Sequence, residues 1–350
     1  MRQVSTEVKH LEAELAEVES RRDEQLARLP NFPAPEAPEG STEDDAVVLR
    51  EVGNRPEFDF DVRDHLELGV ANGWIEMEKA AEASGSRFAY LLGHLVLVEL
   101  ALVRLAVELT GEEGFVPVVP PVLVREGPLF GTGFFPTERE MIYEIPRDEL
   151  FLVGTSEVSL AALHAAEILA AAELPYRYAG LSTCFRREAG AAGKDTRGIF
   201  RVHQFDKVEM FSFVLPQDST AEHARLLAIQ ERILQALELP YRVVDIAAGD
   251  LGASAARKFD CEAWIPSQDR YREVTSCSNT TDYQARRLGS RYRPEPDAQP
   301  AHVHTLNGTA VAVGRTLIAL IENGQRADGS VALPAALQDA GAPAAIGGRG

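Results

Sequence analysis

One segment, residues 184–210, constrains the fold of this chain more than any other part of its 350-residue sequence. It reads CFRRE at residues 184–188, passes through a loop of small residues that includes glycines, and returns as RVHQFDKVEM at residues 201–210. Two strand-like runs around such a loop are typical of a long β-hairpin. Charged side chains stand at both ends of the predicted hairpin, where they can project from a sheet toward a ligand.

The residue types in this hairpin suit a ligand that carries phosphate and a purine. Arg186 has a rigid fork of donors that matches a phosphate lying beside a carboxylate. Phe205, on the returning strand, can stack on a purine ring. A short Phe-Arg-x-Glu string by itself is more often a surface hairpin with salt bridges. The full string favours a nucleotide site.

Residues 58–337 carry the pattern of one α+β domain. Its strand-like runs are mostly separated by hairpin-like loops and not by regular βαβ units, which favours an antiparallel sheet flanked by helices. The expected strands span residues 115–123, 149–153, 176–185, 200–214, 241–247, 258–266, 271–276 and 303–306. The expected helices span residues 88–110, 159–172, 220–237 and 310–323.

The two ends of the chain differ from this domain. Residues 1–29 predict a helix whose apolar residues recur at spacings of four and three, a seam that seeks a partner helix: Val4, Val8, Leu11, Leu15 and Val18. Residues 30–57 are rich in Pro, Glu, Asp and Gly, and they predict a linker. Residues 338–350 are rich in Ala, Gly and Pro, and they predict a disordered tail.

Composition excludes several classes of protein. A formal net charge of −19 disfavours a general nucleic-acid binder, because such binding depends on neutralising phosphates. Three widely spaced cysteines without a CxxC pair indicate reduced thiols in a cytosolic protein. The first thirty residues lack the apolar core of a signal peptide, and charged residues interrupt the apolar run at 90–109. We therefore expect a cytoplasmic protein with no membrane span.

The hairpin string at 184–210 resembles motif 2 of the class II aminoacyl-tRNA synthetases, and the seryl type in particular. Four further segments agree with this resemblance. Thr155-Ser156-Glu157 resembles the loop that holds the amino acid, and YREVTSCSN at 271–279 resembles the nucleotide-and-metal strand of the seryl type. The run HTLNGTAVAVGR at 304–315 resembles motif 3, and the proline-punctuated run at 115–123 resembles motif 1, the dimer element.

The resemblance implies a class II synthetase core that forms a homodimer and activates L-serine with ATP. The implied ATP-binding residues are Arg186, Glu188, Val202, His203, Gln204, Phe205, Glu273, Val274, Thr275, Ser276 and Arg315. The implied serine-binding residues are Thr155, Ser156, Glu157, Arg186, Glu209 and Thr309. Glu273 and Ser276 would hold Mg²⁺ through oxygen, as a hard cation requires. No zinc is expected, since the Thr-x-Glu loop and Thr309 match the zinc-free type.

The implied chemistry needs no protein nucleophile, because the carboxylate of serine is itself the nucleophile. Arg186 and Arg315 would be the catalytic residues, with Arg186 on the α-phosphate and the serine carboxylate and Arg315 on the γ-phosphate. Glu188 would accept a hydrogen bond from the adenine amino group, and Phe205 would stack beneath the ring. Glu209 and Thr309 would bind the serine hydroxyl. Catalysis would be in-line positioning with charge neutralisation.

Two departures from the resemblance affect these expectations. The family carries a long helical hairpin that grips the tRNA, whereas residues 1–29 match only its returning helix. The acceptor of serine therefore stays open between tRNA(Ser), met through Lys194 and Arg197 of the motif 2 loop, and a carrier protein or small metabolite. A late gene start would also account for the short arm. A non-catalytic regulatory paralogue is a further alternative, which the intact Arg186, Glu188, Glu273 and Arg315 disfavour. Thr280 stands where the family usually has an aromatic residue.

Overall fold

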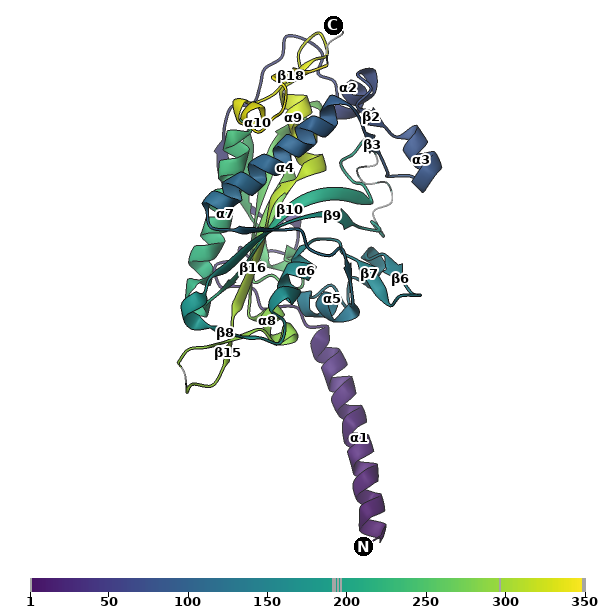
Figure 1. Cartoon of the computed structure of the whole chain (residues 1–350), viewed down its shortest axis with the longest axis vertical. Coiled ribbons are helices and arrows are strands. Elements are labelled where there is room, and N and C mark those ends of the chain that lie inside the picture. The colour runs from purple at the N-terminus through teal and green to yellow at the C-terminus, as the bar shows by residue number, and fades with distance from the viewer. Residues whose placement is uncertain (1, 191–192, 194, 196, 296, 348–350) are drawn as a thin grey trace.

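The computed structural model describes residues 2–190, 193, 195, 197–295 and 297–347 of the chain. Within these residues, the largest sheet has eight strands in the order β1-β11-β12-β13-β16-β10-β9-β4 (Figure 1). Its strands are β1 Val47–Val52, β4 Val116–Val118, β9 Tyr176–Phe185, β10 Gln204–Val214, β11 Tyr241–Asp245, β12 Arg257–Ile265, β13 Arg270–Thr281 and β16 His304–Ala312. Every neighbouring pair is antiparallel except β4 and β9, which are parallel. The predicted α+β class is confirmed.

The helices gather around this sheet. Their bounds are α1 Arg2–Ala27, α2 His65–Ala71, α3 Glu78–Ser84, α4 His94–Glu112, α5 Glu126–Thr132, α6 Glu157–Ala161, α7 Ser219–Ala236, α8 Tyr283–Leu288, α9 Val313–Asn323 and α10 Ala335–Asp339. Helices α4, α7 and α9 cover one face (Figure 1), and their apolar sides form the main core with the sheet. Leu95, Ile229 and Leu317, one from each helix, are almost fully buried there.

Four small sheets complete the fold. They are β2 Ile75–Glu76 with β3 Tyr90–Leu91, β5 Leu123–Val124 with β7 Leu150–Leu152 and β6 Glu144–Ile145, β8 Ile168–Ala170 with β14 Arg291–Arg293 and β15 Ala301–His302, and β17 Val331–Ala332 with β18 Ala345–Ile346.

The predicted hairpin at 184–210 is present as the facing ends of β9 and β10. Their register places Glu209 opposite Gly180 on β9, while β16 brings Thr309 beside Glu209 on the other side. Gly180 also lets α6 approach the sheet, because an added Cβ would lie 2.9 Å from Leu160 Cδ1 and 3.0 Å from Ser156 Oγ. The Thr-Ser-Glu loop at the start of α6 can therefore lie directly over β9 and β10.

The structure corrects the prediction that residues 30–57 are a linker without regular structure. Val47–Val52 forms strand β1, which pairs with β11 at the edge of the main sheet. The preceding residues are also bound to the domain: Asn31 donates from its amide to Ser254 O at 2.9 Å and Thr280 O at 2.8 Å. Backbone groups that regular structure does not satisfy find partners in the 248–256 loop instead. Composition alone does not reveal such tertiary hydrogen bonds.

The structure also corrects the prediction that the C-terminal tail is disordered. Residues 338–350 were expected to be disordered, yet Ala345–Ile346 forms β18 against β17 and Ile346 is buried in the main core. Leu333 N donates to Ala344 O at 3.0 Å. The burial of Ala340, Ala342 and Ile346 in the main core stabilises this segment, although its composition predicts disorder. Residues 348–350 lie outside the described residues.

The helix expected over 159–172 ends much earlier than predicted. The α-helix ends at Ala161, a single 3₁₀ turn follows, and Ile168–Ala170 becomes strand β8 in parallel with β14. His164 is held by its neighbours, because Ser290 Oγ donates to His164 O at 2.9 Å and the imidazole stacks on Tyr176. These tertiary contacts override a helical propensity that is only a weak preference.

The helix predicted at the N-terminus is present as α1, which projects away from the domain (Figure 1). Its seam residues are exposed along the whole length of the helix: Val4, Val8, Leu11, Leu15 and Val18. Nothing in the described part of the chain covers this seam, so the apolar spacing that predicts a partner helix is left without one in this single chain.

Candidate active site

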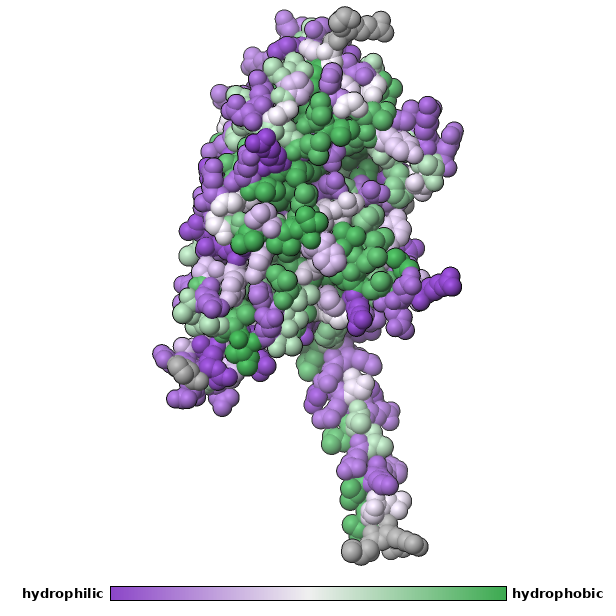
Figure 2. Space-filling view, in the orientation of Figure 1, coloured by the Kyte–Doolittle hydropathy of each residue, from purple (hydrophilic) through white to green (hydrophobic). Residues whose placement is uncertain are grey.

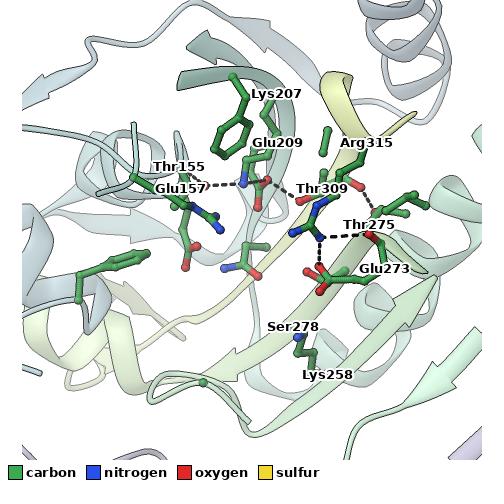
Figure 3. A pocket seen from close by; sticks show the side chains of 18 of the residues that line it. Thr155, Glu157, Lys207, Glu209, Lys258, Glu273, Thr275, Ser278, Thr309 and Arg315 are labelled. Carbon is green, nitrogen blue, oxygen red and sulfur yellow. Dashed lines mark hydrogen bonds and ion pairs between the residues drawn. The ribbon is translucent and has the colours of Figure 1, made fainter. Parts of the chain in front are cut away.

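A cavity of about 430 Å³ opens above the central strands of the main sheet, and Figure 3 shows its side chains. Most residues expected to bind ATP or serine meet in it, although they come from widely separated segments of the chain. Those that line it are Thr155, Glu157, Arg186, Glu188, Val202, Phe205, Glu209, Glu273, Val274, Thr275, Ser276, Thr309 and Arg315. Ser156, His203 and Gln204 do not line it.

These three residues have other positions. Ser156 is buried and donates to Gly180 O at 3.3 Å, which ties the Thr-Ser-Glu loop to β9. His203 Nδ1 lies 2.8 Å from Arg186 O, so the imidazole supports the backbone of Arg186. Gln204 lines a second cavity of about 320 Å³, which shares Val202 and Phe205 with the first. Ser156 and His203 therefore hold neighbours in place.

One end of the cavity is a compact polar group on β10, β16 and the Thr-Ser-Glu loop (Figure 3). Lys207 Nζ lies 2.5 Å from Glu209 Oε2 and donates to Thr155 Oγ1 at 2.7 Å. Thr309 Oγ1 donates to the same Glu209 oxygen at 3.1 Å. Glu209 and Lys207 are both buried, so this end holds a desolvated ion pair with a hydroxyl on each side.

Glu157 is the second carboxylate of this polar end. Burial raises the pKa of Glu157 to about 7, and the negative charge of Glu209 adds to the rise. Gln284, Lys207 and Asn307 oppose it, with Gln284 Nε2 donating to Glu157 Oε1 at 2.7 Å. A carboxylate with a pKa near neutrality, in a cleft, is poised to respond to a bound cation.

Arg186 stands in the middle of the cavity, at the end of β9. Its Nε donates to Gly154 O at 3.2 Å, and its guanidinium carbon lies 5.3 Å from the centre of the Phe205 ring. Among the described residues, no carboxylate forms an ion pair with Arg186. The backbone and the ring therefore fix its orientation, while the rest of its donor fork is left for an anion.

Two arginines flank Phe200, which also lines the cavity. The guanidinium carbon of Arg272 lies 3.9 Å from the ring centre, and that of Arg315 lies 5.0 Å from it. Nearby, Arg201 Nη1 donates to Glu188 Oε2 at 2.8 Å, so Glu188 is held beside the loop end of the hairpin. Three arginines therefore gather at this end of the cavity, and each of them is paired with a carboxylate.

The far wall of the cavity carries Glu273 on β13. Arg315 Nη1 donates to Glu273 O at 3.1 Å and lies 3.3 Å from Glu273 Oε1. Burial by itself would raise the pKa of Glu273, but Arg315, Lys258 and Arg186 hold that pKa far below its usual range, at about 2. Glu273 is therefore ionised at neutral pH, and Lys258 lies close to it across the strands (Figure 3).

Several cavity residues were not found by sequence analysis. They are Thr132, Gly133, Phe134, Glu138, Ile199, Phe200, Arg201, Lys207, Gly252, Ala253, Ser254, Ala255, Lys258, Ser278, Asn307, Ala312 and Gly314. Three of these residues could have been predicted from the sequence, because residues two positions apart on a strand share one face. Lys207 is two residues from Glu209, Asn307 is two from Thr309, and Ser278 is two from Ser276. The residues of the 252–255 loop give no such signal.

The three cysteines, Cys184, Cys261 and Cys277, are free thiols packed in the interior. Burial raises the pKa of each thiol above its ordinary value, which favours the neutral form. None of them lines the cavity. Across the described residues, no helix has both the length and the apolar character needed to cross a membrane.

Comparison with known families places the cavity in context. Residues 141–324, which include most of the cavity, match the model of the tRNA synthetase class II core domain (G, H, P, S and T). The serine--tRNA ligase of Acidothermus cellulolyticus is 58% identical over 332 residues, covering 95% of this chain and 78% of that protein. The serine--tRNA ligase of Nocardia farcinica is 54% identical, covering 96% of this chain and 79% of that protein.

Solved structures agree with the sequence comparison. The seryl-tRNA synthetase of Pyrococcus horikoshii, complexed with ATP, superposes with a TM-score of 0.96 at 41% identity, covering 100% of this chain and 83% of that one. The cytoplasmic serine-tRNA ligase of Naegleria fowleri, in complex with AMP, has a TM-score of 0.91 at 35% identity, covering 98% and 82%. By fold, site and sequence, the chain belongs to the serine--tRNA ligase family of class II aminoacyl-tRNA synthetases.

Proposed function

We propose that this chain activates L-serine with ATP to form seryl-adenylate and then transfers serine to tRNA(Ser). The observation that carries the proposal is the position of Arg186. Its Nε donates to the backbone next to the Thr-Ser-Glu loop, its charge acts on Glu273 at the other wall, and no carboxylate pairs with it among the described residues. The relatives are serine--tRNA ligases, and two related structures are complexes with ATP and AMP.

The charges at the polar end favour an amino acid over a neutral ligand. Glu157 and Glu209 are two carboxylates, and Lys207 supplies one cation. An ammonium group next to Glu157 would be the second cation and would balance the cluster, which matters because unpaired charge is costly in a desolvated site. The serine hydroxyl would then replace water on Glu209 and Thr309, which already share a hydrogen bond.

The nucleotide end has a matching set of groups. Phe205 offers a ring face for adenine, and Glu188, held by Arg201, offers a carboxylate to an exocyclic amine. Arg315 would bind the terminal phosphate. With both substrates present, the serine carboxylate attacks the α-phosphorus, the bond to the bridging oxygen breaks, and pyrophosphate leaves. The Arg186 fork neutralises the charge that develops on the phosphoryl oxygens.

The far wall also suits Mg²⁺. Glu273 and Ser276 both line the cavity and offer a carboxylate and a hydroxyl oxygen, the kind of ligand that this cation prefers. No three His, Cys, Asp or Glu side chains among the described residues form a metal cluster, so further ligands would come from water and the ATP phosphates. When bound, the cation would neutralise phosphate charge.

Replacing Glu273 with glutamine tests this assignment. We expect the Mg²⁺ concentration for half-maximal exchange to rise by roughly tenfold, because the carboxylate ligand becomes a neutral amide. The measurement is ATP–pyrophosphate exchange titrated with Mg²⁺ at saturating serine. Glu262→Gln is the matched control, since Glu262 lies on the neighbouring strand, pairs with Arg242 and does not line the cavity. An unchanged Mg²⁺ requirement in Glu273→Gln would remove Glu273 from the metal site.

The two half-reactions can be assayed separately. We expect ATP–pyrophosphate exchange that depends on L-serine, and charging of tRNA(Ser) by the same preparation. Absence of exchange from a folded protein with Mg²⁺ would overturn the proposed activation step. Exchange without any charging of tRNA(Ser) would instead favour a different serine acceptor. No described feature of the cavity supports such an acceptor.

The two residues expected to meet the acceptor end of tRNA(Ser) lie in the motif 2 loop. Arg197 forms ion pairs with Asp64 and Glu67, and Lys194 lies outside the described residues.

A homodimer formed through the motif 1 region is also proposed. Apolar side chains gather over α4 and the neighbouring surface (Figure 2), and Leu97, Leu100, Val116 and Val119 are exposed there. A contiguous exposed apolar patch usually marks an interface. We propose a cytosolic location for the same protein, in keeping with its buried, reduced thiols.

A further inference from the structure

A buried chain of hydrogen bonds ends on Glu157 and is not part of the cavity wall. It starts at Thr280 on β13, passes to Thr305 on β16 and then to Gln284 on α8. The hydroxyls of Thr280 and Thr305 lie 2.6 Å apart, Thr305 Oγ1 donates to Gln284 Oε1 at 2.9 Å, and Gln284 Nε2 donates to Glu157 Oε1 at 2.7 Å.

All three supporting side chains are fully enclosed. Thr280, Gln284 and Thr305 each have 0% exposure, whereas Glu157 reaches the cavity. A side-chain network buried to this degree is held only when its donors and acceptors are matched, because each unmatched group would cost stability. The chain joins β13, α8 and β16 to Glu157, which lies 127 positions before Gln284, so it forms only in the complete fold.

The contacts of the Gln284 amide give the chain a direction at its Glu157 end. Gln284 Oε1 can only accept, and it accepts from Thr305; its amide nitrogen can only donate, and it donates to Glu157. Rotating the amide by half a turn would place its oxygen against the Glu157 carboxylate, and an ionised Glu157 has no proton to donate to it. The Thr305 hydroxyl and an ionised Glu157 therefore both suit a Gln284 amide that presents N–H to Glu157.

A β-bulge makes this arrangement possible. The register between β13 and β16 shifts between Asn279 and Thr281, and Thr280 is the extra residue at that shift. The bulge turns the Thr280 hydroxyl toward Thr305, where it also lies 2.7 Å from Thr305 O. On the other side, Asn31 Nδ2 donates to Thr280 O at 2.8 Å and anchors the bulge.

From this geometry we infer that Gln284 is a positioning residue for serine, which orients Glu157 and keeps it ionised so that it can receive the substrate ammonium group. The inference rests on the proposed function. Glu157 faces Glu209 and Lys207 from β10, Gln284 from α8 and Asn307 from β16. Of these, the Glu209 charge opposes ionisation, whereas Gln284, Lys207 and Asn307 favour it, and the Gln284 hydrogen bond has the largest effect of the three.

Replacing Gln284 with methionine tests the inference, because methionine has a similar length and no donor. The KM for serine at pH 7 is expected to rise by about tenfold, since a hydrogen bond to a charged group is lost, while the KM for ATP stays unchanged. Glu157 must be ionised to bind the ammonium group, and loss of the donor raises the pKa of Glu157. The acid limb of kcat/KM for serine is therefore expected to move up by about one pH unit.

Graded variants separate positioning from a structural role. Gln284→Glu places a second carboxyl group against Glu157 and is expected to move the acid limb at least as far. This variant also tests the inference if Gln284→Met does not fold. Thr305→Val removes the hydroxyl that orients the amide and is expected to have a smaller effect of the same kind. Thr110→Val is the matched control, because Thr110 is equally buried and donates only within α4.

The outcomes of this experiment are distinct. Wild-type protein without serine-dependent exchange would refute the proposed function itself. Wild-type exchange together with an unchanged serine KM and an unmoved acid limb in both Gln284 variants would overturn the positioning role. A loss of thermal stability with no shift of the acid limb would also overturn it, because a purely structural residue does not move the pH profile.

Discussion

The Arg186→Ala variant is expected to lose serine-dependent ATP–pyrophosphate exchange by roughly a thousandfold. Arg186 lines the cavity without a carboxylate partner among the described residues, and Gly154 O and the Phe205 ring fix its direction. Its donors can act on the α-phosphate and the serine carboxylate together. Removing it leaves the developing charge on phosphorus without its nearest counter-charge.

Stability should change little in this variant. Arg186 forms no ion pair among the described residues, so its removal leaves no buried carboxylate uncompensated, and the melting temperature is expected to fall by only a few degrees at most. Exchange is measured by labelled pyrophosphate, and folding by thermal unfolding. Arg187→Ala is the control: Arg187 is adjacent and exposed, and it does not line the cavity, so it should retain near wild-type exchange.

A lysine at position 186 gives a sharper comparison. It keeps the positive charge but loses the planar fork, and we expect it to recover only a small part of the activity. Near wild-type exchange in Arg186→Lys would show that charge alone is sufficient. Exchange within tenfold of wild type in Arg186→Ala would remove Arg186 from the chemical step.

The second large effect is expected at Glu209. Glu209→Ala should raise the KM for serine by roughly a thousandfold and change the KM for ATP far less, because a site built to bond a hydroxyl loses most of its discrimination when that partner is removed. Glu209 and Thr309 are the pair that would hold the hydroxyl. The preference for serine over alanine should fall with it, as measured by exchange with each amino acid.

Glu209→Ala also leaves Lys207 as a buried ammonium without its 2.5 Å partner, so a loss of stability of about 3–5 kcal/mol is expected beside the kinetic effect. The double variant Glu209→Ala with Lys207→Met separates the two. It should regain much of the stability, because neither member of the buried Lys207–Glu209 ion pair is left without the other, yet it should still bind serine poorly. Equal changes in the KM values for serine and ATP would count against the assigned role of Glu209.

The strands and the residues of the motifs could be predicted from the sequence because their signals are local. The hairpin of β9 and β10 follows from two β-rich runs around a glycine loop, and the alternation along each run places Glu209 on the ligand side. Arg186, Phe205 and Arg315 were likewise identified by residue type within recognisable strings. Residues two positions from these motif residues, such as Lys207 and Asn307, could have been found by the same alternation.

The tertiary structure decided what depends on contacts between distant segments. Strand β1 forms in an apparent linker because β11 offers it an open edge, and the helix expected at 159–172 ends early because β14 takes Ile168–Ala170 into a sheet. Neither partner is visible in the local sequence. The pairing of Gln284 with Glu157, 127 positions apart, arises in the same way.

Sequence by itself therefore determined the fold class, the family and most of the side chains that enter the cavity, since each depends on residue type and short-range spacing. Only the tertiary structure decided the protonation state of those side chains. The pKa of Glu157 rises to about 7 while that of Glu273 falls to about 2, although both are glutamates in recognised motifs. Burial acts on both, and the difference comes from their neighbours: a second carboxylate beside Glu157, and three cations around Glu273.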